Sequence, residues 1–192
     1  MRLAAVTLLT LFNQNPTGRQ ETPELSIRAL LTFVGKNEDG VLVQAVGIPW
    51  QDILAELAKD PEGAYRIPPR EWEEIIAGAY TKAGFDEVVL TPRSGDFGRD
   101  VVATKHGVGS IRIFDQVKAY KPGHVVTADE VCSMLGVITG AANVSKGVMT
   151  TTSTFAARVR DDPYLKPFLP FRLELKDRDE LFPWLQSLAG KA

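Results

Sequence analysis

Three polar residues near the middle of the chain carry the side chains that phosphodiester hydrolysis needs. Asp100 directly precedes the apolar run "VVAT", whereas Gln116 and Lys118 lie in "IRIFDQVKAY". We expect both runs to be strands joined by the Gly-containing turn "KHGVG". Side chains alternate between the two faces of a strand, so Gln116 and Lys118 share a face and Asp115 points away. Pairing through the turn would bring Asp100 near Gln116 and Lys118 at one edge of a sheet.

An acid, an amide and an amine in one place suit a site for a divalent cation such as Mg²⁺. Magnesium takes a few protein oxygen ligands and leaves its other positions to water or phosphate. Asp100 and Gln116 would supply two of these oxygens. Glu73, on the expected helix 71–83, would supply a third, although Glu74 competes for this role and an ordinary solvated helix face is the alternative.

Lys118 has several possible roles beside such an ion. A bound metal would polarise the phosphodiester and lower the pKa of a bound water. Lys118 could orient or deprotonate that water, or neutralise charge that develops on the phosphate. The sequence leaves these roles open. Lysine is rarely buried without a partner, and its place inside a β-rich run therefore favours a function.

Alternating elements position these residues from residue 71 onward. A helix, "EWEEIIAGAYTK", precedes three strands, and a second helix follows "TADE", in which Thr127 and Glu130 have capping-box spacing. We then expect a strand at "KGVMTTT", a helix at "STFAARVRDD", a strand at "PFRLEL" and a last helix that breaks or begins at Pro183. The order α-β-β-β-α-β-α-β-α predicts an α/β fold, a mixed sheet flanked by helices.

Residues 1–67 are predicted to form an N-terminal extension of unknown role. The run "MRLAAVTLLTLF" is expected to be a buried strand or helix, and residues 13–24 a polar loop. Two β-rich runs around "GKNEDG" predict a hairpin, and a helix should begin at Pro49. The apolar run is too short to span a bilayer and no signal-cleavage site follows it, so we expect a cytoplasmic protein without a membrane anchor.

The motifs together resemble the PD-(D/E)xK nucleases, and in particular the Mrr-like restriction endonucleases, in which glutamine replaces the second acid. The resemblance rests on "WEEIIAGAYTKAGF", "SGDFGRD", "QVKAY" and "KGVMTTTSTF", and covers about residues 70–188. It implies a restriction-endonuclease-like αβββαβ core at residues 68–192. By position it implies Asp100 and Gln116 as metal ligands, Lys118 as the catalytic lysine and Glu73 as an accessory acid.

The function that this resemblance implies is Mg²⁺- or Mn²⁺-dependent cleavage of DNA, in defence against modified or foreign DNA. Two alternatives stay open: a junction-resolving or repair nuclease on the same fold, and a catalytically inactive DNA-binding or assembly module. Cutting both strands needs two active sites, so a homodimer or homotetramer is plausible.

Charge supports a local rather than a global contact with DNA. The whole chain has a net charge of −2, whereas residues 93–124 contain six Lys or Arg against three Asp. The hydroxyl-bearing residues after "KGVMT" could bind a phosphate at a helix N-terminus, or could simply cap that helix. The candidate DNA contacts are Arg93, Arg99, Lys121, His124, Thr152 and Ser153. The single cysteine, Cys132, excludes an intrachain disulfide, and we expect it in the core.

Overall fold

The computed structural model describes residues 31–92 and 98–189. The predictions for residues 1–24 therefore lie outside the described residues, as does the candidate DNA contact Arg93.

Within the described residues, one mixed sheet contains seven strands in the order of the chain. The first five strands pair antiparallel, and the pairs β5–β6 and β6–β7 are parallel. The expected mixed sheet is therefore confirmed. Its strands are β1 (Leu31–Asn37), β2 (Gly40–Ala45), β3 (Glu87–Leu90), β4 (Val101–Lys105), β5 (Ile111–Lys118), β6 (Lys146–Thr151) and β7 (Leu173–Lys176).

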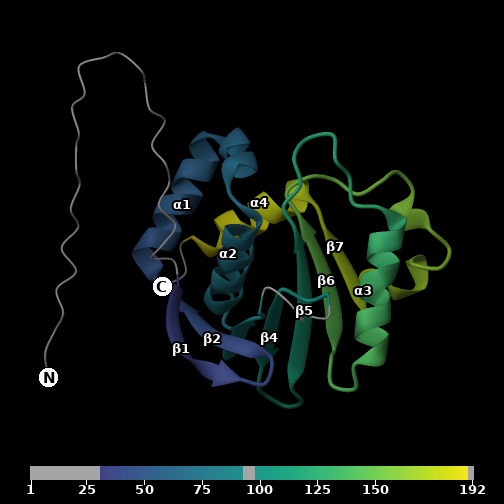
Figure 1. Cartoon of the computed structure of the whole chain (residues 1–192), viewed down its shortest axis with the longest axis horizontal. Coiled ribbons are helices and arrows are strands. Elements are labelled where there is room, and N and C mark those ends of the chain that lie inside the picture. The colour runs from purple at the N-terminus through teal and green to yellow at the C-terminus, as the bar shows by residue number, and fades with distance from the viewer. Residues whose placement is uncertain (1–30, 93–97, 190–192) are drawn as a thin grey trace, which may run out of the picture.

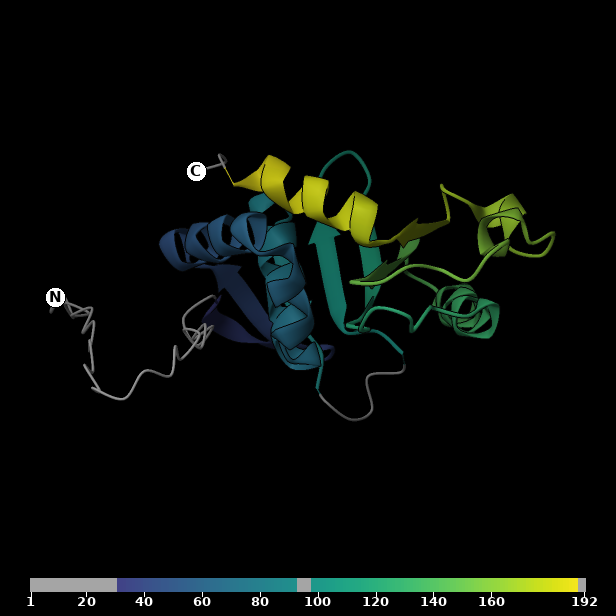
Figure 2. The same ribbon diagram turned by 90° about the horizontal axis from the view of Figure 1, so that it is seen from above.

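Helices cover both faces of this sheet (Figures 1 and 2). Three of them pack on one face, namely α1 (Gly47–Lys59), α2 (Pro69–Lys82) and α4 (Arg178–Leu188), and α3 (Ala128–Gly140) packs on the other. Short 3₁₀ turns at Pro61–Arg66, Val159–Asp161 and Lys166–Phe168 connect the elements. Among the described helices, none combines the length and the apolar character that crossing a bilayer requires.

The alternation of strand residues divides the core into two apolar clusters. Val101 and Ala103 of β4 face the cluster formed with α1, α2 and α4, which includes the fully buried Trp72. Val102 and Phe114 face the second cluster, against α3. A residue on β4 or β5 can therefore be assigned to the α2 face or the α3 face by its parity in the sequence.

The expected helix over residues 153–162 is wrong. The chain instead runs beside the segment that precedes α3, where Val126 forms a parallel bridge with Phe155. The amide of Val126 donates to the carbonyl of Thr154 (2.9 Å), and the amide of Ala156 donates to the carbonyl of Val126 (2.8 Å). These non-local hydrogen bonds replace those of a helix, and only the 3₁₀ turn Val159–Asp161 forms.

Two smaller predictions are also wrong. The helix α4 continues through Pro183, because a capping box of Asp177 and Glu180 sets its start and Leu181 and Leu185 bury one side of it. Cys132 is exposed, since its neighbour Val131 takes the buried side of α3.

The hairpin β1–β2 extends the same sheet rather than standing apart from it. Strand β2 pairs with β3, and the indole of Trp50 on α1 donates to the carbonyl of Ile75 on α2 (3.4 Å). The division that we placed between residues 67 and 68 remains a prediction about function, because residues on both sides of it share one sheet and one core.

Asp39, in the turn of this hairpin, joins it to the strands that carry the candidate site. Its carboxylate forms ion pairs with Arg99 (3.3 Å) and with Arg112. Both guanidinium groups lie over the ring of Phe114, Arg99 at 4.7 Å and Arg112 at 5.6 Å from its centre. The Asp39 side chain is only 9% exposed, so removing it leaves two partly buried cations without a counter-charge.

We expect Asp39→Ala to lower the free energy of unfolding by about 2 kcal/mol, which is less than for a fully buried pair because both arginines retain some exposure. Urea unfolding of the two proteins measures the difference. The control is Glu56→Ala, which removes an exposed ion pair with Lys59 and should leave the stability at the wild-type value. Equal stability of Asp39→Ala and wild type would contradict this role.

Candidate active site

Asp100 directly precedes β4, at the end of the sheet where Gln116 lies near the end of β5. The last registered pair joins Val101 to Asp115, and the amide of Asp100 donates to the carbonyl of Asp115 (2.8 Å), so Asp100 lies next to this part of β5. The Asp100 carboxylate also accepts a hydrogen bond from the amide of Val117 (2.7 Å), which fixes it against β5.

Gln116 and Lys118 point to the α3 face. Phe114 belongs to the cluster on that face, and Gln116 and Lys118 follow it at two-residue intervals. The Gln116 amide nitrogen and Val137 of α3 both lie close to Gly98: a Cβ atom at Gly98 would be 3.6 Å from the first and 3.3 Å from the second. Gln116 therefore extends toward α3. The structure thus brings the acid, the amide and the amine to one end of the sheet.

Lys118 has a partner that the sequence analysis missed. Its ammonium lies 3.5 Å from a carboxylate oxygen of Glu130 on α3, and about a quarter of each side chain is exposed. Tyr120 donates to the same oxygen of Glu130 (2.5 Å). The sequence singled out Glu130 only as part of the capping box with Thr127, which the structure contains. The spacing of Thr127 and Glu130 predicts the start of the helix, but it does not predict the contact of Glu130 with Lys118.

These contacts shift the pKa values of Glu130 and Tyr120. Burial by itself would raise the pKa of Glu130, but hydrogen bonds from Thr127 and Tyr120 and the charge of Lys118 outweigh it and lower the pKa to about 2. Burial, followed by the hydrogen bond to Glu130, raises the pKa of Tyr120 to about 12. At neutral pH the site therefore contains an ionised Glu130 and a protonated Tyr120.

Glu73 lies at the same end of the sheet but on the α2 side. Its carboxylate is 2.5 Å from the guanidinium of Arg70, which also donates to the carbonyl of Thr91 (3.1 Å). The amide of Thr91 in turn donates to the carbonyl of Asp100 (3.1 Å). Glu73 is thus connected to the backbone at Asp100, and its first partner is Arg70 rather than the other candidate ligands.

The donor set fits a magnesium ion that keeps most of its water. Among residues 31–92 and 98–189, no cluster of three or more His, Cys, Asp or Glu could enclose a metal. One carboxylate, from Asp100, and one amide, from Gln116, would be few protein ligands, with which Mg²⁺ retains several waters or phosphate oxygens. A zinc-type cage of imidazoles and thiolates is not present in this part of the chain.

Asp115 precedes Gln116 on β5 and is fully buried on the α2 face. Burial raises its pKa to about 8, although hydrogen bonds from Tyr80 (2.8 Å) and Thr150 (3.0 Å) and the charge of Lys176 oppose the rise. The charge of Asp100 adds to it. Asp115 is therefore mainly protonated at neutral pH in the metal-free protein.

Stability in EDTA should fall as the pH rises from about 4 to about 8, because folded Asp115 keeps a proton that the unfolded chain releases. One proton contributes a slope of up to about 1.4 kcal/mol per pH unit. Asp115→Asn mimics the protonated acid, so it should lack this component. Urea unfolding at several pH values checks this: the stability of Asp115→Asn relative to wild type should increase with pH, and a constant difference would contradict a raised pKa.

The candidate DNA contacts differ in their accessibility. Lys121 and His124 are exposed beyond the end of β5, where the imidazole of His124 stacks on Tyr120 (4.1 Å between ring centres). Arg99 is held by Asp39 and Phe114. Thr152 and Ser153 are 2% and 5% exposed, and no helix begins there. The hydroxyl of Thr152 donates to the carbonyl of Tyr120 (2.8 Å). Buried hydroxyls of this kind support the strand end rather than a phosphate.

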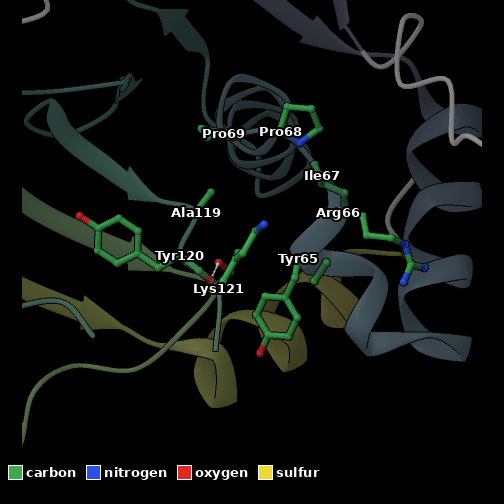
Figure 3. Close-up of a pocket in the computed structure, with 10 residues that line it drawn as sticks. Tyr65, Arg66, Ile67, Pro68, Pro69, Ala119, Tyr120 and Lys121 are labelled. Atoms are coloured by element: carbon green, nitrogen blue, oxygen red, sulfur yellow. Dashed lines mark hydrogen bonds between the residues drawn. The ribbon is translucent and has the colours of Figure 1, made fainter. Parts of the chain in front are cut away.

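A pocket of about 470 Å³ opens one residue beyond Lys118 (Figure 3). The residues around it are Ala64–Pro69, Ala119–Lys121 and Thr152. Figure 3 shows Lys121 extending into this space, whereas the ring of Tyr120 and the guanidinium of Arg66 point away from it. Arg66 pairs instead with Asp60. Of the two cationic side chains around the pocket, Lys121 is therefore the one that extends into it beside the candidate site.

The fold and this site define the class of protein to which the chain belongs. Residues 64–185 match a family model, Mrr_cat, described as a restriction endonuclease. The chain belongs to this Mrr-like restriction endonuclease family, and its matched part is a nuclease domain. The resemblance noted from the motifs is thereby confirmed.

Two solved structures are similar to the chain. They are described as "MspJI Restriction Endonuclease in Complex with 27-mer Oligonucleotide" (16% identity, TM-score 0.47, 76% of this chain) and "DNA modification-dependent restriction endonuclease AspBHI" (19% identity, TM-score 0.47, 77% of this chain). The matches cover 36% and 38% of those proteins. The chain thus spans less than two thirds of their length. No curated protein gives a significant sequence match.

Proposed function

We propose that this protein is a magnesium-dependent endonuclease that hydrolyses phosphodiester bonds in DNA. The observation that carries the proposal is the position of Asp100, Gln116 and Lys118, which lie together at one end of the sheet. Membership of the restriction endonuclease family supports DNA as the substrate.

Each residue has a distinct part in the proposed reaction. Asp100 and Gln116 would hold Mg²⁺, or Mn²⁺ in its place, by one carboxylate and one amide oxygen, with Glu73 as an accessory acid from α2. The bound ion supplies Lewis-acid activation of the phosphodiester and of a water. Lys118 places a positive charge where the phosphate gains negative charge as water attacks phosphorus and the bond to the leaving oxygen breaks.

We expect the DNA backbone to bind the surface formed by the residues that follow β5. Lys121 and His124 are exposed next to Lys118, and a cation beside the scissile phosphate would contact neighbouring phosphates. Arg99, Thr152 and Ser153 already have partners inside the protein, so Lys121 and His124 are the contacts that we retain.

Cleavage of modified or foreign DNA in host defence is the biological role that we propose, in the cytoplasm and as a dimer or tetramer that cuts both strands. A catalytically inactive DNA-binding module is the second candidate. It is favoured by the ion pair between Glu73 and Arg70, because this carboxylate has a partner other than the proposed metal.

Supercoiled plasmid and matched short duplexes test these candidates. Wild-type protein with Mg²⁺ should convert the plasmid to nicked and linear forms, and EDTA should stop the reaction. A panel of methylated, unmodified and branched duplexes separates a defence enzyme from a junction-resolving or repair nuclease. DNA binding that persists in EDTA, without cleavage under Mg²⁺ or Mn²⁺, would instead establish the inactive module.

A further inference from the structure

We propose that Glu130 is a positioning residue of the nuclease site, whose carboxylate holds the ammonium of Lys118 on the α3 face beside Asp100 and Gln116. This inference rests on the proposed function, and it adds a residue that lies outside the strand motifs.

The Glu130 carboxylate is itself held by groups on two elements. One oxygen accepts hydrogen bonds from the amide (2.9 Å) and the hydroxyl (3.0 Å) of Thr127, which begins α3. The other oxygen accepts the Tyr120 hydroxyl (2.5 Å) from the segment after β5 and faces the Lys118 ammonium at 3.5 Å. The carboxylate therefore has a fixed position before any substrate binds.

These contacts also define what Glu130 does. An ionised carboxylate has about four acceptor positions, and here three hydrogen bonds and the Lys118 ammonium take up most of them. We therefore assign Glu130 to holding Lys118 rather than to binding the ion or the phosphate.

Lys118 needs such a partner because its side chain is long and flexible. A lysine has about 2 kcal/mol of rotamer entropy, and a misplacement of about 1 Å at a reacting centre can cost roughly a hundredfold in rate. An exposed ion pair would contribute little, but both groups here are about three-quarters buried against α3. The N-terminus of α3 thereby becomes part of the site, although a connecting segment separates it from β5, which carries Gln116 and Lys118.

The variant Glu130→Gln tests the inference, because glutamine also serves in a capping box and so preserves the start of α3. With the full-length chain and plasmid DNA, we expect kcat to fall roughly tenfold to a hundredfold, with KM changing less than threefold and the melting temperature staying close to the wild-type value. Thr127→Ala is the matched structural comparison: it weakens the helix cap and removes one donor to Glu130, but it keeps the carboxylate and its ion pair with Lys118. It should therefore lower the melting temperature and reduce kcat less than Glu130→Gln does.

A second measurement does not depend on cleavage. An amine-reactive reagent applied to DNA-free protein, followed by peptide mass spectrometry, gives the modification rate of each lysine. Glu130→Gln should increase the rate at Lys118 at least threefold and leave exposed Lys166 unchanged. Equal rates at Lys118 in the two proteins, or an unchanged kcat in Glu130→Gln, would overturn the inference. Failure of wild-type protein to cleave any DNA, with the Lys118 protection intact, would overturn the proposed function instead.

Discussion

Lys118→Ala should reduce magnesium-dependent DNA cleavage roughly a hundredfold or more, because it removes a preorganised positive charge from the site of the developing phosphate charge. The structure gives the reason for this size. Lys118 lies at the end of β5 on the face that it shares with Gln116, and its ammonium lies 3.5 Å from the Glu130 carboxylate. The substitution leaves only small changes elsewhere, since the backbone of Lys118 still pairs with Thr151 and Thr152.

Single-turnover cleavage of a labelled duplex at saturating Mg²⁺ measures this loss as a rate. The control is Lys166→Ala, which removes an exposed lysine paired with Asp161, far in sequence from the site. It should cleave like the wild type. Wild-type rates in Lys118→Ala would refute the proposed mechanism, whatever the DNA affinity of the variant.

Asp100→Asn is expected to have an effect of similar size through the metal. Asparagine keeps an oxygen that can accept the hydrogen bond from the Val117 amide, so the register of β4 and β5 should persist. It removes the negative charge of the proposed metal ligand. Hard cations such as Mg²⁺ prefer carboxylate ligands, and we expect cleavage to fall roughly a hundredfold or more, together with weaker Mn²⁺ binding.

Calorimetric titration with Mn²⁺ separates the metal effect from a folding effect. Asp100→Asn should bind Mn²⁺ at least tenfold more weakly, while Asp161→Asn, an exposed acid on a 3₁₀ turn, should bind like the wild type. Gln116→Ala should weaken binding less than Asp100→Asn, because it removes a neutral ligand. Unchanged Mn²⁺ affinity in Asp100→Asn would show that the ion binds elsewhere.

Glu73 is a candidate ligand whose local partner the sequence analysis did not consider. The resemblance implies that Glu73 is an accessory acid, and the structure pairs it with Arg70, one turn earlier on α2. The spacing of Arg70 and Glu73, three residues apart on a helix, is itself a known signal for an ion pair. If Glu73 serves the metal, Arg70 must release it, and that coupling makes it the weakest member of the proposed ligand set.

Much of the fold and the centre of the site could be predicted because the information is local. Apart from the helix expected at residues 153–162, the order of strands and helices from residue 71 follows from alternation, capping residues and turn glycines. The approach of Asp100 to Gln116 follows from the short connection at 106–110, since a tight hairpin leaves little choice of register. The Gln-x-Lys spacing then places both side chains on one face.

Tertiary packing decided the remainder, because each missed feature depends on groups far apart in the chain. Residues 152–158 remain irregular since they pair with the segment at Val126, and the N-terminal hairpin joins the sheet through β3 and Asp39. Glu130 reaches Lys118 only after α3 packs on the face that carries Gln116. Local periodicity specifies which face a side chain takes, whereas the partner that it meets there depends on how distant elements pack.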